Sequence, residues 1–137
     1  MKVKIKKLRE NAMYPTMGSI HAGAWDVYAS TVQVTEDYIE YGIGMACKIP
    51  EGWRLDAVPR SSLSKTDYVL ANSYGVIDPD YIGEVKFRFK YIGIGNPHVL
   101  PYNIGDRIGQ VFLSEVHDIL WEKVTELPDT QRGDGGF

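Results

Sequence analysis

Hydrophobic and polar residues alternate along most of this chain. The longest alternating row runs through Ile39, Tyr41, Ile43, Met45, Cys47 and Ile49, with Glu40 and Lys48 on the opposite side. A period of two predicts a β-strand with one face on a core and the other toward water or a neighbouring subunit. Shorter stretches predict further strands at residues 3–5, 25–29, 31–35, 53–57, 76–77, 85–91, 108–113 and 119–124.

No window of the sequence places apolar residues at helical spacing, and glycine and proline separate the expected strands. Many short strands between such turns are typical of an all-β sandwich, jelly roll or barrel. The hydroxyl-rich segment 59–65 departs from the pattern and predicts a loop or a single helical turn. We expect one β domain over residues 1–127 and a mobile C-terminal arm over 128–137, because the arm has almost nothing to bury.

Composition narrows the class of protein. The chain has 137 residues, of which 44% are hydrophobic, and a net charge of −3. That charge gives no bulk attraction to nucleic acid or to an anionic membrane. The single cysteine, Cys47, allows no internal disulfide and favours a reducing compartment. Without a signal-peptide block or a membrane-length apolar run, we expect a soluble cytoplasmic protein with no nucleic-acid or membrane partner.

Residues 74–84 carry the densest candidate chemistry. Asp78, Pro79 and Asp80 interrupt a strand, Tyr81 follows, and Gly83 precedes the next strand. A turn at a sheet edge that displays two carboxylates and a phenol suits a small polar ligand. Asp and Pro are also common turn formers, so ordinary turn chemistry explains the same residues.

Three other segments hold groups that suit phosphate. Arg60, Ser61 and Ser62 combine a guanidinium with hydroxyls, although a capped surface turn has the same composition. Gln110 follows a turn in which Asp106 and Arg107 fit either a site or a surface ion pair.

The third segment is the glycine-rich arm, where Arg132 suits a phosphate and the Phe137 ring suits stacking on a flat base. A frayed terminus is the alternative. The three histidines, His21, His98 and His117, lack metal-ligand spacing, so no zinc site is expected.

Five segments in order resemble the motifs of the trimeric dUTP pyrophosphatases (dUTPases). They are Ala22–Val27, Pro59–Leu63, Gly75–Glu84, Gly105–Gln110 and Arg132–Phe137. The resemblance implies a jelly-roll or distorted β-barrel homotrimer whose active sites draw on more than one subunit. It also implies hydrolysis of dUTP to dUMP and pyrophosphate, with Mg²⁺ on the triphosphate.

The resemblance assigns a role to each matching residue. Asp78 is the general base that activates water, and Tyr81 lies under the deoxyribose. Asp26 reaches the metal through water, Arg132 binds the terminal phosphate, and Phe137 covers the base. The uracil pocket is lined by Asn72, Val76, Ile77, Asp78, Gly83 and Lys86. The phosphates are contacted by Arg60, Ser61, Ser62 and Gln110.

The sequence departs from the family pattern at a few positions. Ser62 stands where glycine is usual, and Gly109 replaces a usual alanine. The sequence stops at Phe137, where family members continue with a short Gly/Ser/Thr segment. Two rival functions follow. A dCTP deaminase shares the fold but needs a glutamate where Arg88 stands, and an arginine cannot be that acid or base. A non-catalytic homologue would bind nucleotide and signal to a protein partner.

Overall fold

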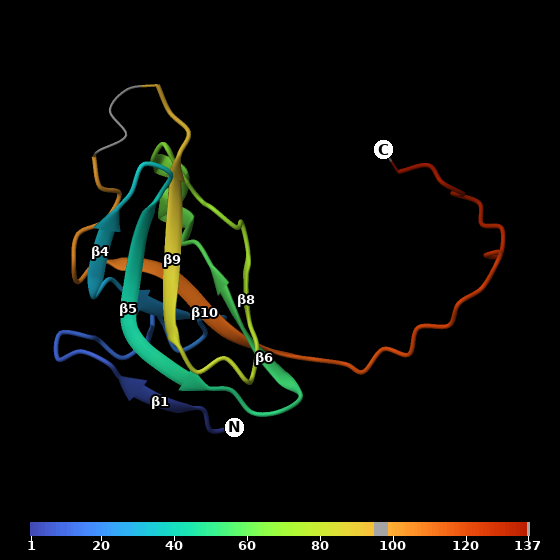
Figure 1. Cartoon of the computed structure of the whole chain (residues 1–137), viewed down its shortest axis with the longest axis horizontal. Coiled ribbons are helices and arrows are strands. Elements are labelled where there is room, and N and C mark those ends of the chain that lie inside the picture. The colour runs from blue at the N-terminus through green and yellow to red at the C-terminus, as the bar shows by residue number, and fades with distance from the viewer. Residues whose placement is uncertain (95–98, 137) are drawn as a thin grey trace.

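Two antiparallel five-stranded sheets form the body of the protein, in the computed structural model that describes residues 1–94 and 99–136 (Figure 1). The first sheet has the order β1-β5-β9-β7, with β4 also on β5, and the second has the order β2-β3-β10-β6-β8. The first sheet contains β1 (Lys4–Lys7), β4 (Thr31–Val34), β5 (Ile39–Lys48), β7 (Tyr68–Leu70) and β9 (Glu84–Tyr91). The second contains β2 (Thr16–Met17), β3 (Trp25–Tyr28), β6 (Trp53–Val58), β8 (Gly75–Ile77) and β10 (Arg107–Glu115).

This architecture confirms the all-β prediction. The one helical element in the described residues is a 3₁₀ helix, η1 (Ser61–Lys65), in the segment that predicted a loop or helical turn. The described part of the chain contains no helix long and apolar enough to span a membrane.

The core lies between the sheets and follows the alternating rows. On β9, Val85, Phe87 and Phe89 are buried and alternate with exposed cations. The Tyr41 ring of β5 meets Phe89 edge-on at 5.8 Å, and its hydroxyl donates to the Tyr102 carbonyl at 2.8 Å. Burial raises the pKa of Tyr41 to about 12, so this hydroxyl remains a donor at neutral pH.

The polar side of β5 differs from the expectation. Glu40 was expected to face water or a neighbouring subunit, but it is only 7% exposed. It pairs in register with Arg88 of β9, and the side chains of Lys86 and Arg88 cover it. Alternation identifies the face of a strand, but not what the neighbouring strand places over that face.

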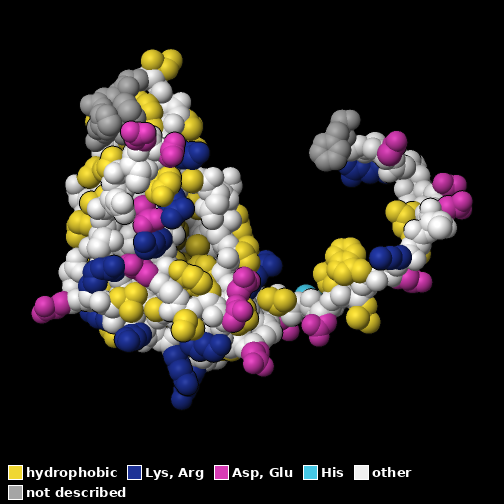
Figure 2. Space-filling view, viewed as in Figure 1, with side chains coloured by type: hydrophobic (Ala, Val, Ile, Leu, Met, Phe, Trp, Pro, Cys, Tyr) yellow, Lys and Arg dark blue, Asp and Glu magenta, His cyan; other side chains and the backbone are white. Residues whose placement is uncertain are grey.

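The C-terminal part of the chain also differs. No strand forms at 119–124, because the chain leaves the body after β10 and finds no edge to pair with (Figure 1). Leu120 is 98% exposed and Trp121 is 86% exposed. Hydrophobic side chains therefore stand in solvent along the arm (Figure 2). The short strand β7 was not predicted from the sequence, because three residues are too few to show a period of two.

Candidate active site

A cavity of about 510 Å³ opens beside the β8 hairpin, between the two sheets. It collects residues from β6, β7, β8 and β9. Six of the residues predicted for a base pocket and sugar contact line it, namely Asn72, Val76, Ile77, Asp78, Tyr81 and Lys86. Gly83 does not line the cavity, but it packs against the ring of Tyr81, which does.

The hairpin turn after β8 sets the position of Tyr81. The Tyr81 amide donates to the Asp78 carbonyl at 3.2 Å, and the Tyr81 hydroxyl donates to the Glu84 carbonyl at 2.9 Å. The ring therefore folds back over Gly83, where a Cβ atom would lie 2.5 Å from the hydroxyl oxygen. Glycine at this position therefore leaves room for the phenol, and any larger residue would force the Tyr81 ring to shift.

Asp78 lies exposed at the cavity mouth. Its turn is tethered by Lys48, whose Nζ donates to the Pro79 carbonyl at 2.9 Å. Within the described residues, the Asp78 carboxylate has no hydrogen-bond or ion-pair partner. An unpaired carboxylate on a tethered turn can accept a proton from a water molecule.

Asp56 lies on β6, the strand that pairs with the β8 strand of the hairpin. It is fully buried on β6 opposite Val76, and it accepts hydrogen bonds from Arg54 Nε at 2.9 Å and from the Ser114 hydroxyl. Burial favours the neutral acid, but hydrogen bonding by Ser114 and Tyr74 and the Arg54 charge outweigh it. They hold the pKa of Asp56 below its usual value. In the predicted strand 53–57, Asp56 and Arg54 alternate with Trp53, Leu55 and Ala57, which is typical of an exposed polar side and gives no signal of this burial.

A second cluster brings together residues of three predicted segments. Asp26 on β3 is 3% exposed, and Arg107 Nη1 and Gln110 Nε2 each donate to it at 3.1 Å. Arg60 Nε lies 3.5 Å from the same carboxylate. Arg107 therefore pairs with Asp26 and not with Asp106, which corrects the surface-pair interpretation. The Asp106 carboxylate instead accepts from the Asn103 amide at 2.7 Å.

The start of η1 lies beside this cluster. Arg60 Nη1 donates to the Ser62 hydroxyl at 3.4 Å and to the Arg107 carbonyl at 3.2 Å. The backbone N–H groups of Ser61 and Ser62 have no partner among the described residues. Free amides, hydroxyls and guanidinium groups are the donors that phosphate oxygens accept.

The donor set does not form a protein-held metal centre. In residues 1–94 and 99–136, no three His, Cys, Asp or Glu side chains are grouped as metal ligands. Both oxygens of Asp26 are already occupied by Arg60, Arg107 and Gln110, which disfavours direct coordination and leaves contact through water with a metal that arrives on phosphate. Mg²⁺ commonly binds in this way, because it keeps several waters and prefers phosphate oxygens.

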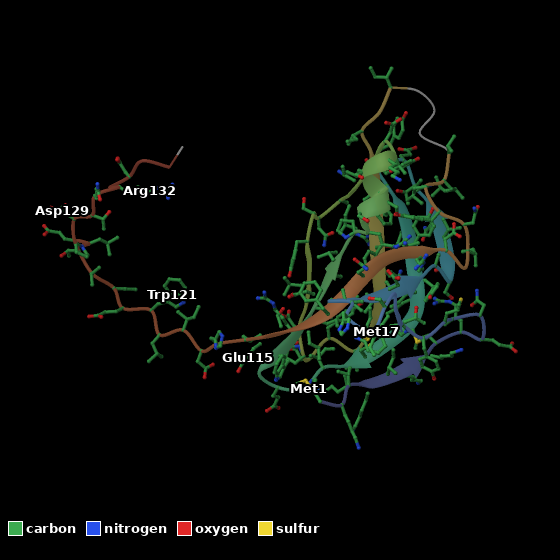
Figure 3. All side chains as sticks on the ribbon, turned by 180° about the vertical axis from the view of Figure 1, so that it is seen from behind. Met1, Met17, Glu115, Trp121, Asp129 and Arg132 are labelled. Atoms are coloured by element: carbon green, nitrogen blue, oxygen red, sulfur yellow. The ribbon has the colours of Figure 1, made fainter. Side chains whose placement is uncertain are left out.

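The arm does not reach either cluster within one chain. Arg132 lies well away from the body, as Trp121 does (Figure 3). Its Nε donates to the Gly135 carbonyl at 2.7 Å, within the arm itself. Phe137 lies outside the described residues, so its predicted role over the base stays a prediction.

Three charged residues near the cavity were missing from the sequence-predicted site. Glu84 and Arg88 line the cavity, and Glu40 joins Lys86 to Arg88 from below. The sequence did contain a signal for Arg88, since it lies two residues after Lys86 on the same face of a strand. Glu40 had no comparable signal, because its contacts come from a strand more than forty residues away.

Both the sequence and the fold of this chain are similar to those of known dUTPases. The dUTPase family model matches residues 10–137. A deoxyuridine 5'-triphosphate nucleotidohydrolase of Syntrophotalea carbinolica is 37% identical over 142 residues, covering 98% of this chain and 93% of the relative. Among solved structures, a mutant Staphylococcus bacteriophage 80alpha dUTPase with dUpNHpp has a TM-score of 0.79 at 21% identity, covering 99% of this chain and 96% of the phage chain.

A mutant dUTPase from phage phi11 of S. aureus has a TM-score of 0.75 at 21% identity, covering 92% of this chain and 98% of the phage chain. Its structure describes the coordination of a structural Mg(II) ion. The two-sheet body is therefore the fold of the phage dUTPases. With a family model that spans nearly the whole chain and a relative of 37% identity, the chain belongs to the dUTPase family.

Proposed function

We propose that this protein hydrolyses dUTP to dUMP and pyrophosphate by attack of water on the α-phosphorus. The full-length similarity to deoxyuridine triphosphate nucleotidohydrolases supports the reaction. The single observation that carries the residue assignment is Asp78, an exposed and unpaired carboxylate, on a tethered turn, at the mouth of a cavity lined by the predicted base-pocket residues. Asp78 is the general base, and it removes a proton from the attacking water.

Tyr81 positions the sugar. Its hydroxyl is committed to the Glu84 carbonyl and its side chain lines the cavity, so we infer that the ring offers an apolar face to the sugar. A deoxyribose packs on that face, whereas a 2′-hydroxyl would lose its hydration there without gaining a partner. Asn72, Val76, Ile77 and Asp78 line the part of the cavity that takes the base. Gly83 leaves the space that the Tyr81 ring occupies.

The triphosphate takes the second cluster. Arg60 and Gln110 each hold Asp26 with part of their donor set, and the amides and hydroxyls of Ser61 and Ser62 complete the site. Displacement at phosphorus depends on in-line positioning and charge neutralisation more than on covalent help. Mg²⁺ supplies further neutralisation when it binds the triphosphate, and Asp26 is the residue that contacts it through water.

Hydrolysis is tested directly by pyrophosphate release. With Mg²⁺ present, the purified protein is expected to release pyrophosphate from dUTP and far less from dCTP, because the base pocket favours uracil. The control is the same assay with dTTP, whose 5-methyl group tests the fit of the cavity. Intact dUTP after prolonged incubation contradicts the proposed reaction.

The complete site is proposed to form in a homotrimer, in which the arm of one subunit closes the cavity of another. The arm leaves its own body, its apolar side chains are exposed, and Arg132 lies well away from the body (Figure 3). Burial of these side chains against a second copy removes apolar area from water and stabilises the assembly. In that position Arg132 binds the terminal phosphate and Phe137 covers the base.

Subunit mixing tests the shared site. Asp78→Asn chains and Arg132→Ala chains are each expected to hydrolyse dUTP poorly, and trimers reassembled from both are expected to recover activity. The reason is that some mixed trimers contain one site with an intact Asp78 and an intact arm. Each variant reassembled with itself is the control. A mixture no more active than the average of its parents contradicts arm exchange, and a monomeric protein in sedimentation contradicts the trimer.

A further inference from the structure

Two cations form one wall of the base cavity. Lys86 and Arg88 are successive residues on the outward face of β9, and both line the cavity with Asp78 and Tyr81. Only Lys86 had a predicted role in the pocket. Basic side chains on an exposed strand face usually point freely into solvent, so their arrangement here is informative.

Glu40 holds both cations. Its carboxylate is 8% exposed and accepts from Lys86 Nζ at 2.6 Å through Oε1 and from Arg88 Nε at 2.7 Å through Oε2. The Arg88 guanidinium also lies 4.6 Å above the Tyr38 ring. Long basic side chains lose substantial rotamer freedom when they are fixed. Glu40 supplies that fixation from below, because each of its oxygens has its own partner.

The charges of this group persist at neutral pH. The hydrogen bond from Lys86, with a smaller contribution from Arg88, outweighs burial and holds the pKa of Glu40 below its usual value. The same hydrogen bond raises the pKa of Lys86. Both shifts favour the ionised pair, so the wall remains cationic across the physiological range.

Lys86 and Arg88 can only donate hydrogen bonds. An ammonium has three donors and a guanidinium has five, and neither has an acceptor. Since each spends one donor on Glu40 in the structure, further donors remain for a ligand. The other charged residue of this wall, Glu84, is already committed to the Gly44 amide at 2.8 Å and to Arg9 Nη2 at 2.9 Å.

We propose that Glu40 is a positioning residue that fixes Lys86 and Arg88 as a donor-only wall, and that this wall admits a 4-oxo pyrimidine and rejects a 4-amino pyrimidine. The 4-oxygen of uracil accepts hydrogen bonds, whereas the 4-amino group of cytosine donates them. A donor placed against fixed donors gives up hydrogen bonds to water without gaining a partner, which costs affinity. The inference rests on the proposed function and extends it to residues outside the predicted site.

The test compares discrimination between the two bases. For Glu40→Gln, the ratio of kcat/KM for dUTP to that for dCTP is expected to fall about tenfold or more, since freed cations no longer form a fixed wall. The ratio of dissociation constants for dCMP and dUMP, measured by calorimetry, is expected to fall in parallel. Glu36→Gln is the matched control, because it removes the same charge from an exposed position nearby.

A second variant covers any folding defect caused by changing a buried carboxylate. The Arg88 side chain is 54% exposed, so Arg88→Gln preserves the core, and its amide oxygen can accept from a 4-amino group. We expect this variant to relax discrimination as Glu40→Gln does. Arg88→Lys keeps a donor-only cation and is expected to restore most of the wild-type ratio. A purely structural role for Glu40 would change the melting temperature without changing these ratios.

The outcomes separate this inference from the proposed function. If both Glu40→Gln and Arg88→Gln keep the wild-type ratios within about twofold, the donor wall is wrong even when dUTP is hydrolysed. If the wild-type protein leaves dUTP intact but binds dUMP more tightly than dCMP, and both variants lose that preference, the wall stands and the proposed hydrolysis fails. Wild-type protein that leaves dUTP intact and binds neither monophosphate contradicts both.

Discussion

Asp78→Asn is expected to reduce kcat for dUTP by about a hundredfold or more while nucleotide affinity changes only a few fold. The amide keeps the shape of the side chain but cannot take a proton from water. Because the Asp78 carboxylate has no partner in the described residues, its replacement leaves no buried group unpaired. Turnover is measured by pyrophosphate release and affinity by calorimetry with a non-hydrolysable dUTP analogue.

Asp80→Asn is the matched control for that experiment. Asp80 is an exposed carboxylate in the same turn, and it does not line the cavity. Its replacement is expected to leave kcat nearly unchanged. If Asp78→Asn turns over dUTP at close to the wild-type rate, or if both variants lose activity equally, Asp78 is not the base.

Gly109→Ala is expected to destabilise the protein by about 1–3 kcal/mol, although alanine is usual at this position in the family. Gly109 is buried on β10, and a Cβ atom there would collide with the Phe87 ring, 2.5 Å from Cζ. Phe87 is 1% exposed, so its ring has no open space into which to move. The large ring on β9 and the missing methyl on β10 are therefore complementary. Thermal unfolding is the measurement, with a fall of several degrees expected.

A double-mutant cycle identifies the cause. Phe87→Leu alone is expected to destabilise by leaving a cavity, but with Gly109→Ala the combined loss should be smaller than the sum of the two. Gly23→Ala is the control, since a Cβ atom there would meet nothing within 4 Å. Equal melting temperatures for Gly109→Ala and Gly23→Ala would refute the packing argument.

The sequence predicted most of the strands because their apolar rows are long enough to show a period. It also predicted the hairpin at Asp78 and the groups near Asp26, because local motifs carry those positions. It could not predict the burial of Glu40 and Asp56, since each depends on side chains from a strand that is distant in sequence. A row of alternating residues indicates that a polar face exists, and only the tertiary structure shows which partners cover it.

The arm shows a different limit. Ile119 to Val124 has the composition of a strand, but a strand exists only where another edge accepts its hydrogen bonds. In one chain no edge is within reach, and the segment stays unpaired (Figure 1). The pattern predicts what the residues can form, while the presence of a partner decides whether they form it.

The ion pair between Arg9 and Glu84 ties the leading segment of the chain to the base cavity. Glu84 is the one carboxylate in the wall that Lys86 and Arg88 form, and Arg9 is one of the groups that keeps its oxygens occupied. A released Glu84 would offer an acceptor to an amino-substituted base, so under the proposed donor wall the loss of Arg9 is expected to weaken discrimination between the two bases. The N-terminal segment is therefore linked to the base cavity through the Arg9–Glu84 ion pair.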